Sequence, residues 1–272
     1  MQQFAFLENG VEHNVLLPPP ETELLPGIHW GNPCELFTPA YWYAQYLMRG
    51  AFNTKSGAHR IGQTFAEELT ACILGGYGIP AEIGLAAFCR LREESLISGL
   101  CTDQQVLERR LQEPLCVQGR FVKYRFWRQK AMYLSAAFSA IKTQEFSTSD
   151  VLMLKTRLMA LPGVGPKTAS WVVRNWLGSD QVAILDIHVV RAGLLMNLFS
   201  PEDDVARDYP SMEAKFISFS QALGVPTSDL DALIWGMMRT TPKLVKRLLN
   251  QMPTAAQSEP SSLARPIQSP GA

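Results

Sequence analysis

Apolar and polar residues alternate in two short runs at the start of the chain, and this period of two is typical of β-strands. The runs cover residues 4–7 and 11–17, and Asn9-Gly10 lies between them. Asn-Gly favours the backbone of a two-residue hairpin turn, and three consecutive prolines end the second run. The pattern therefore predicts a β-hairpin within an extended N-terminal segment, residues 1–37.

From Thr38 onward the apolar positions recur with the spacing of amphipathic helices. Thr64 and Glu67 have the spacing of a capping box, and a Gly-Gly-Tyr-Gly stretch at 75–78 ends the apolar run that follows them. Further helices are predicted over residues 80–92, 103–112, 130–142, 150–160, 167–177, 188–198, 212–223 and 229–238. The expected fold class is mainly α, with a helical domain over residues 38–251 and a short N-terminal β-hairpin appendage.

The end of the chain has a different composition. Residues 252–272 are rich in Pro, Ser, Ala and Gln and contain few large apolar side chains. A segment of this kind cannot bury enough apolar surface to offset the entropy lost on ordering. We therefore expect a disordered tail over residues 252–272.

The overall composition is that of a globular protein. The 272 residues are 47% hydrophobic and 18% charged, which excludes a disordered or fibrous chain. No apolar run approaches the roughly 18 residues of a membrane span, and the first 30 residues contain no Lys or Arg. We expect no signal peptide, no membrane partner, and a monomeric cytoplasmic protein, associated with the nucleoid if its source is bacterial or archaeal.

The cysteines give no sign of a structural framework. They are odd in number and widely spaced, which argues against disulfides or a zinc ribbon. They are Cys34, Cys72, Cys89, Cys101 and Cys116. We expect them to be reduced and mostly buried.

The charges cancel in total but are unevenly distributed. The chain has 25 Lys+Arg and 25 Asp+Glu, yet residues 1–48 contain acids and no Lys or Arg. Residues 108–130 carry seven bases against two acids, and residues 239–247 add four bases with no acid among them. These stretches can form basic faces that bind phosphates, although solvated helix faces explain them equally well on charge alone.

The most informative stretch is LMALPGVGPKTASWVVRNWLGSDQVAILDIHVVR, residues 158–191. Two apolar helices are joined by a turn too short for anything but a tight helical hairpin. Gly163 and Gly165 allow backbone angles and a close approach that side chains would block, so the N–H groups around Val164 can face a DNA phosphate. Carbonyls on the opposite edge of the turn can hold a monovalent cation.

Two side chains of this stretch have the chemistry of a catalytic pair. Lys167 lies in the first turn of the second helix, where the helix dipole and burial would lower its pKa and leave a nucleophilic amine. Asp186 follows 19 residues later, after an apolar segment and at the start of the next helix. A carboxylate there can accept a proton or stabilise positive charge on a sugar ring. The alternative is a surface lysine and an ordinary N-cap.

LPGVGPKTA, followed by the aspartate of LDIHVVR, resembles the helix-hairpin-helix, Gly/Pro-rich-loop and aspartate motif of the base-excision DNA glycosylases. Three weaker matches resemble the archaeal-type 8-oxoguanine branch of that superfamily: FAEELTACILGGYGIPA, YRFWRQKAMYL and LDALIW. Together they span about residues 38–240. The resemblance implies two helical subdomains with a cleft between them and a partner that is double-stranded DNA containing a modified base.

The resemblance also implies the reaction, a bifunctional glycosylase and abasic-site lyase. The target base is flipped out of the duplex. Lys167 then attacks C1′ of its sugar, Asp186 assists by charge stabilisation, and the strand is nicked by β-elimination. His188 is expected to contact a phosphate or orient Asp186, unless it is a capping or core histidine. No cofactor is implied.

Further residues are implied in base and DNA contacts. Trp235 is expected to stack on the flipped base, with a core tryptophan as the alternative. Gln129 and Lys130 are candidates for contacts near the unpaired partner base.

Two departures from the pattern concern the substrate. Tyr77 stands where relatives have an Asn-containing turn, so the preference for the opposite base is in doubt, and the tyrosine can act as a wedge in the base stack. Trp171 lies four residues after Lys167, on the same helix face, where a ring would reshape the base pocket unless it belongs to the hairpin core. A modified base other than 8-oxoguanine, including a hypermodified phage base removed in anti-phage defence, is therefore an alternative substrate.

Two other interpretations account for parts of this pattern. The endonuclease-III type of the superfamily carries a four-cysteine iron–sulfur cluster after the aspartate, but the last cysteine here is Cys116, before the hairpin, so no iron–sulfur cluster is expected. A non-catalytic helix-hairpin-helix DNA-binding module would keep the turn for phosphate contacts alone. The presence of both Lys167 and Asp186 favours the enzyme.

Overall fold

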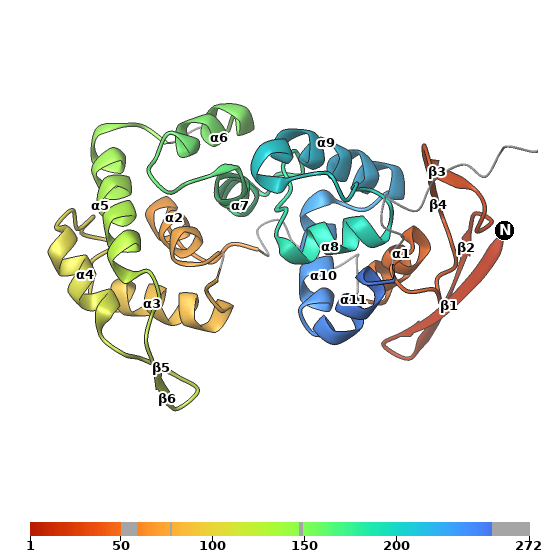
Figure 1. The fold of residues 1–272 in the computed structure, drawn as a ribbon, viewed down its shortest axis with the longest axis horizontal. Helices are drawn as coiled ribbons and strands as arrows, with labels where there is room; N and C mark the ends of the chain where they lie inside the picture. Colours follow the sequence, from red (N-terminus) through yellow and green to blue (C-terminus); the bar gives the residue numbers. More distant parts are fainter. Residues whose placement is uncertain (50–58, 77, 147–148, 252–272) are drawn as a thin grey trace, which may run out of the picture.

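The structure is a computed structural model that describes residues 1–49, 59–76, 78–146 and 149–251 (Figure 1). Two short β-ribbons come first in this part of the chain, followed by helices α1 to α4, a third ribbon and helices α5 to α11. The prediction of a mainly α fold with an N-terminal β-hairpin is confirmed. The predicted tail, residues 252–272, lies outside the described residues.

The N-terminal segment forms two antiparallel ribbons. The first pairs β1 (Gln2–Glu8) with β2 (Val11–Leu17), and the second pairs β3 (Glu23–Leu25) with β4 (Ile28–His29). Asn9 and Gly10 have positive φ angles of 51° and 80°, as the predicted two-residue turn requires. The second ribbon was not predicted, because its strands are too short to show an alternation of apolar and polar residues.

The middle of the chain forms one helical lobe, on the left in Figure 1. Its elements are α2 (Phe65–Leu74), α3 (Ala81–Glu93), α4 (Gln104–Gln112), β5 (Leu115–Val117), β6 (Arg120–Val122), α5 (Trp127–Thr143), α6 (Val151–Met159) and α7 (Pro166–Leu177). They enclose one buried apolar cluster that includes Leu91, Leu134 and Val172. Thr64 accepts a hydrogen bond from the Glu67 N–H and caps α2 as predicted.

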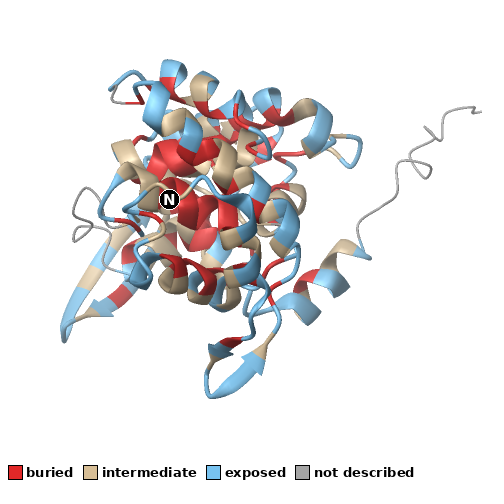
Figure 2. Ribbon diagram, turned by 90° about the vertical axis from the view of Figure 1, so that its left-hand side faces the viewer, coloured by how far each residue is buried: buried red, intermediate tan, exposed pale blue. Residues whose placement is uncertain are grey.

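The two ends of the helical region form the other lobe, on the right in Figure 1. Its helices are α1 (Pro39–Met48), α8 (Ile187–Leu195), α9 (Val205–Leu223), α10 (Thr227–Met238) and α11 (Pro242–Leu249). They surround a second buried cluster that includes Trp42, Phe216 and Ile234. Buried residues fill the interior and exposed ones lie on the outer faces (Figure 2). The chain thus starts in one lobe, builds the other and returns through an extended segment after α7, which ends at Asp186.

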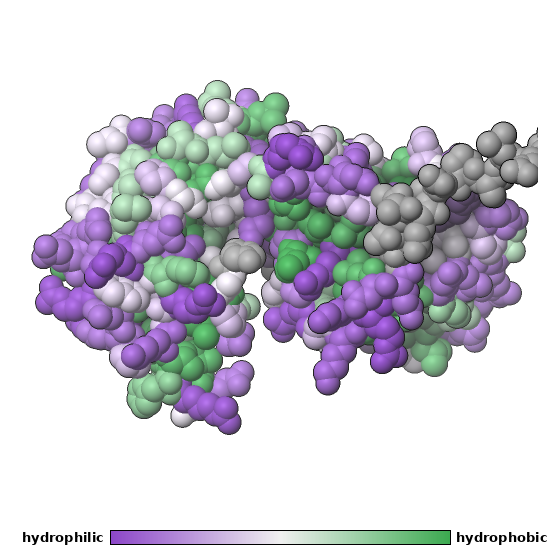
Figure 3. All heavy atoms as spheres, viewed as in Figure 1, coloured by the Kyte–Doolittle hydropathy of each residue, from purple (hydrophilic) through white to green (hydrophobic). Residues whose placement is uncertain are grey.

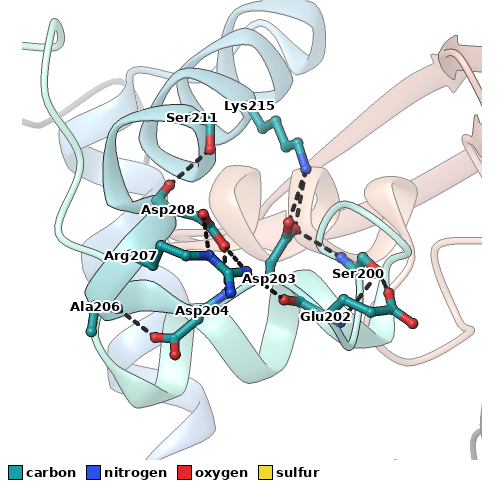
Figure 4. Close-up of polar contacts among 9 residues, drawn as sticks. All are labelled: Ser200, Glu202, Asp203, Asp204, Ala206, Arg207, Asp208, Ser211 and Lys215. Carbon is teal, nitrogen blue, oxygen red and sulfur yellow. Dashed lines mark hydrogen bonds and ion pairs between the residues drawn. The ribbon is translucent and has the colours of Figure 1, made fainter.

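Helix α9 begins seven residues before the predicted start, at Val205 rather than 212. Asp204 caps it by accepting from the Ala206 N–H, and Pro210 lies inside the helix. The acidic residues at this point are paired locally: Arg207 contacts Asp208, and Lys215 contacts Asp203 (Figure 4). Helix α11 was not predicted either, because it is only eight residues long and largely basic.

The cysteines depart from expectation in one respect. All five are free, as expected, but only Cys72 is buried; Cys34 and Cys116 are exposed. Cys116 points outward because it alternates with the inward-facing Leu115 on β5. Within the described ranges, no helix has the length and apolar character needed to cross a membrane.

Candidate active site

The predicted hairpin is formed by α6 and α7, joined by residues 160–165. The Val164 N–H donates to the Leu161 carbonyl at 3.1 Å and closes the turn, and the Val164 side chain is buried. No side chain caps the start of α7. The first N–H groups of α7 are therefore left for a ligand, as an anion site at a helix N-terminus requires.

The two glycines of the turn have different roles. Gly163 has a φ of +77° and the Tyr133 ring packs on it, so closely that a β-carbon would lie 2.1 Å from Tyr133 Cδ2. Gly165 has a φ of −85°, which any residue can adopt, and nothing lies within 4 Å of its β-carbon position. Gly163 is thus required by the fold, whereas Gly165 leaves an open approach to the N–H groups beside it.

Lys167 is the second residue of α7 and its side chain is half-buried. Its Nζ lies 3.9 Å from the β-carbon position of Gly76, at the end of α2. Burial lowers the pKa of Lys167, and the nearby Asp186 carboxylate opposes that shift. The lowered pKa favours a neutral, nucleophilic amine. Tyr77, the neighbour of Gly76, lies outside the described residues.

Asp186 is the N-cap of α8. Its Oδ1 accepts hydrogen bonds from the backbone N–H groups of His188 and Val189, both at 2.9 Å. The N-cap that the sequence indicates as an alternative is therefore present, and the charge of Asp186 also acts on Lys167. Both Asp186 and His188 are half-buried. The predicted contact of the His188 ring with a phosphate stays a prediction.

The extended segment before Asp186 is held by three side chains of the second lobe. Three consecutive backbone N–H groups donate to them: Ala183 to Glu213 Oε1 at 3.1 Å, Ile184 to Asp231 Oδ2 at 3.0 Å and Leu185 to Tyr209 Oη at 3.3 Å. This ladder fixes the direction in which the chain reaches Asp186. Sequence reasoning missed all three acceptors, because nothing local relates them to the segment that they hold.

The two buried acids of this ladder also tie α7 to the second lobe. Glu213 accepts from Ser170 Oγ at 2.7 Å and pairs with Lys155. Asp231 pairs with the buried Arg174, and burial raises the pKa of Asp231 to about 6, an effect that the Arg174 charge opposes. The helix that carries Lys167 and the segment that carries Asp186 therefore share the same anchoring side chains.

Lys130 and Gln129 lie in the first turn of α5. Gln129 is exposed and donates to Tyr133 Oη at 2.7 Å. Lys130 Nζ donates to the carbonyl oxygens of Ile73, at 2.6 Å, and Gly75, at 3.4 Å. Its ammonium group thus lies at the end of α2, beside Lys167. Burial, together with the Lys167 charge, lowers the pKa of Lys130 to about 8.

The two tryptophans predicted for the base pocket lie in different surroundings. The Trp171 ring packs on Gly75, where a β-carbon would be 2.9 Å from Trp171 Cη2, so it borders the same turn as the Lys167 amine. Trp235, on α10, is 38% exposed, and the Arg239 guanidinium lies over its ring at 4.6 Å. Trp235 is therefore not a core residue, whereas Trp171 packs partly on the apolar cluster of the first lobe.

A basic and aromatic surface lies on the ribbon that projects below the first lobe and on the residues after it (Figures 1 and 3). We define this basic-aromatic surface by its exposed members Arg120, Phe121, Lys123, Arg125 and Phe126. Phe126 has a left-handed φ of 61° and its ring reaches Gly78, with Cε2 3.6 Å from the β-carbon position. Within the described part of the chain, none of the three bases forms an ion pair with a carboxylate. Sequence reasoning noted the charges but missed the exposed rings.

Known proteins are similar to this chain in sequence. A family model described as 8-oxoguanine DNA glycosylase matches residues 52–225. The 8-oxoguanine DNA glycosylase/AP lyase of Saccharolobus islandicus strain Y.N.15.51 is 31% identical over 123 residues, which are 42% of this chain and 58% of that protein. The chain therefore spans less than two thirds of the length of this curated relative.

Solved structures give the same picture of the fold. The crystal structure of the 8-oxoguanine DNA glycosylase of Methanocaldococcus jannaschii matches with a TM-score of 0.51 and 26% identity, over 65% of this chain and 78% of that one. The crystal structure of its complex with a 15mer DNA containing 8-oxoguanine matches with a TM-score of 0.51 and 24% identity, over 75% of this chain and 90% of that one. A trapped endonuclease III–DNA covalent intermediate also matches with a TM-score of 0.51, over 71% of this chain and 82% of that one. Its sequence is 18% identical, so the match shows likeness of fold alone.

Proposed function

Because the chain belongs to the 8-oxoguanine DNA glycosylase family, we propose that it is a bifunctional DNA glycosylase and abasic-site lyase that acts on double-stranded DNA containing a modified base. One observation carries the proposal: Lys167 is a half-buried amine in the first turn of the helix after the hairpin, its pKa is lowered by burial, and it interacts electrostatically with Asp186. A protein that only binds DNA needs the turn but not this pair.

The reaction follows from the chemistry of the two side chains. Lys167 Nζ attacks C1′ of the flipped nucleotide, so that a C–N bond to the lysine forms while the glycosidic bond breaks and its electron pair leaves with the base. The attached nitrogen gives up a proton to the departing base, and the C1′–O4′ bond then breaks as O4′ takes up a proton from water, which leaves a Schiff base. Loss of a C2′ proton then expels the 3′ phosphate by β-elimination. The Asp186 carboxylate stabilises the positive charge that develops on the sugar.

The DNA would be held at two places. The uncapped start of α7 supplies N–H groups to a phosphate, with Gly165 leaving room for its approach. The basic-aromatic surface supplies charges for the backbone and exposed rings that can enter the base stack. Because the chain has no net charge, we expect affinity for unmodified DNA to be modest and to fall with salt less steeply than that of a protein contacting eight or more phosphates.

We propose 8-oxoguanine as the excised base. The named relatives and the family model support it. One observation favours a second candidate, a bulkier base such as a hypermodified phage base: the Trp171 ring borders the turn beside Lys167. A ring there reshapes whatever space the base enters, and removal of such a base would serve anti-phage defence.

A panel of duplexes tests the proposal. One preparation is incubated with duplexes carrying 8-oxoguanine, other oxidised bases, glucosylated hydroxymethylcytosine or an abasic site, and both base release and strand nicking are followed. Release of 8-oxoguanine with nicking is expected. Release of only the glucosylated base supports the second candidate, and binding without release or nicking on any duplex would make the protein a DNA-binding module instead.

The reaction needs no cofactor, since the lysine supplies the nucleophile. A monovalent cation on the carbonyl edge of the hairpin turn stays a prediction, and no step depends on it. No group of three or more His, Cys, Asp or Glu side chains in the described ranges is arranged to hold a metal ion. We expect the protein to act as a monomer in the cytoplasm, associated with the nucleoid if its source is bacterial or archaeal.

A further inference from the structure

The side chains of two lysines end near the same turn, at the end of α2. Lys130 Nζ donates to the carbonyls of Ile73 and Gly75, and Lys167 Nζ lies 3.9 Å from the β-carbon position of the next residue, Gly76. They come from different elements, α5 and α7, and are 37 positions apart in the sequence. Neither forms an ion pair with any carboxylate of the described residues. Two cations in so small a space repel each other.

We propose that once the pair has lost one proton, Lys130 is the amine that stays in the ammonium form. The positive charge of Lys130 thereby keeps Lys167 in its neutral form. Lys130 is in this account a positioning residue, because it acts on Lys167 and not on the DNA. The inference deepens the proposed function and rests on it for the role of Lys167 as nucleophile. The proton that Lys167 loses goes to water, because Lys130 is already in the ammonium form and cannot accept it.

The two helix ends decide where the proton rests. The Lys130 ammonium is at the carbonyl end of α2, where two acceptors bind it and the helix dipole favours a cation. Lys167 is at the amide end of α7, where the dipole disfavours a cation and no side chain caps the helix. Both helices therefore favour the proton on Lys130.

The other charges around the pair leave this preference in place. Asp186 attracts a proton to Lys167, but its Oδ1 is already occupied by two N–H groups of α8. Arg125 Nη1 lies 3.9 Å from the β-carbon position of Gly78 and adds positive charge at the same turn. The acids of α2 itself, Glu67 and Glu68, are in its first turn, at the opposite end of the helix.

The titration of the two groups shows that they interact. Burial lowers the pKa of both lysines. The Lys167 charge lowers the pKa of Lys130 further, to about 8, whereas the Asp186 carboxylate opposes the lowering at Lys167. Two amines that interact this strongly titrate as a pair and not one by one. The pair therefore gives up its first proton below the roughly 10.4 of an isolated lysine, and the two helix ends decide which amine loses it.

A titration of the full chain without DNA tests the inference. The protein is labelled with ¹³C at lysine Cε and its NMR spectra are recorded from about pH 6 to about pH 11, with signals assigned through Lys130→Met and Lys167→Gln. In the wild type, the Lys167 signal should titrate first and below the usual lysine range. In Lys130→Met its midpoint should rise by about one unit. Lys130→Arg, which keeps the cation, should keep the low midpoint.

Two results would overturn the inference: a Lys167 midpoint that is the same in Lys130→Met as in the wild type, or a Lys130 signal that titrates first. If Lys130→Met does not fold, Lys130→Gln is used, since it keeps a donor for the α2 carbonyls without the charge. The titration involves no reaction, so it stands apart from the proposed function. Absence of a borohydride-trapped adduct on abasic DNA, with the Lys167 shift present, would overturn the proposed function and not the proton pair.

The same variants link the pair to the reaction. Trapping of an abasic duplex by borohydride should show its rising limb at higher pH in Lys130→Met, by the same amount as the NMR midpoint. A merely structural role of Lys130 would lower the amount of adduct at every pH and leave the position of the limb unchanged.

Discussion

The Tyr133 ring of α5 lies against Gly163 in the hairpin turn, so that a β-carbon on residue 163 would be 2.1 Å from ring atom Cδ2. Gly163 also has a left-handed φ of +77°. The turn that offers N–H groups to DNA is thus fixed by a contact with another helix and by a backbone angle that favours glycine.

Gly163→Ala is expected to lower the free energy of unfolding by at least about 2 kcal/mol, because it combines a strained φ with overpacking. It should also weaken duplex binding. Chemical denaturation and fluorescence anisotropy measure the two effects. Gly165→Ala is the matched control: its φ is ordinary and the space around it is open. It should keep the stability and weaken only the binding. Equal stability losses in the two variants would contradict this account of the turn.

Asp186→Asn tests the negative charge of Asp186 separately from its role as the N-cap of α8. The amide oxygen can still accept from the N–H groups of His188 and Val189, and Asn caps helices about as well as Asp. Thermal stability should therefore change little, whereas base release should slow by at least about 100-fold. Asp150→Asn, at the N-cap of α6, makes the same change outside the site and should keep full activity. Base release at the wild-type rate in Asp186→Asn would rule out a role for the charge.

Trp235→Ala tests the base pocket separately from the sugar chemistry. Loss of the stacking ring should slow release of the modified base by about 10- to 100-fold. Nicking of a duplex that already contains an abasic site should be unaffected, because no base remains to be stacked. Trp235→Phe keeps a ring and should retain most of the activity. If both substrates are lost together in Trp235→Ala, the tryptophan supports the fold and not the base.

Glu213→Ala tests the ladder that holds the segment before Asp186. It leaves the Ala183 N–H, the Ser170 hydroxyl and the Lys155 ammonium without their acceptor. We expect a loss of about 3 kcal/mol in unfolding free energy, since buried donors without partners are costly. Glu213→Gln keeps an acceptor oxygen and should lose less. Glu202→Ala, in the exposed cluster of Figure 4, is the control and should leave the unfolding midpoint unchanged. An unchanged midpoint in Glu213→Ala would contradict the role of the ladder.

Local signals predicted the parts of the fold and site that local residues determine. The Asn9-Gly10 turn, the Thr64 cap and the Pro-Gly turn before Lys167 each act over a few residues, and the structure has each where the sequence indicates it. Helix α9 begins earlier than predicted because Asp204 caps its start, and Pro210 lies inside the helix.

Long-range contacts could not be predicted in this way. Lys130 reaches carbonyls 55 and 57 positions away, and Asp231 accepts from an N–H 47 positions away. No periodicity relates such residues, so the sequence indicated Lys130 as a candidate for contacts near the unpaired partner base but not its place beside Lys167. The exposure of Phe126 depends likewise on a left-handed backbone that its residue type does not favour.

The central claim is that Lys167 is the nucleophile, and peptide mapping of a trapped adduct tests it most directly. Wild-type protein is reacted with the duplex that it processes in the presence of borohydride, digested, and the residue bearing the sugar is identified by mass spectrometry. We predict the adduct on Lys167 alone, and none in Lys167→Gln although that variant still binds the duplex. An adduct on Lys130, or base release at the wild-type rate by Lys167→Gln, would contradict the account.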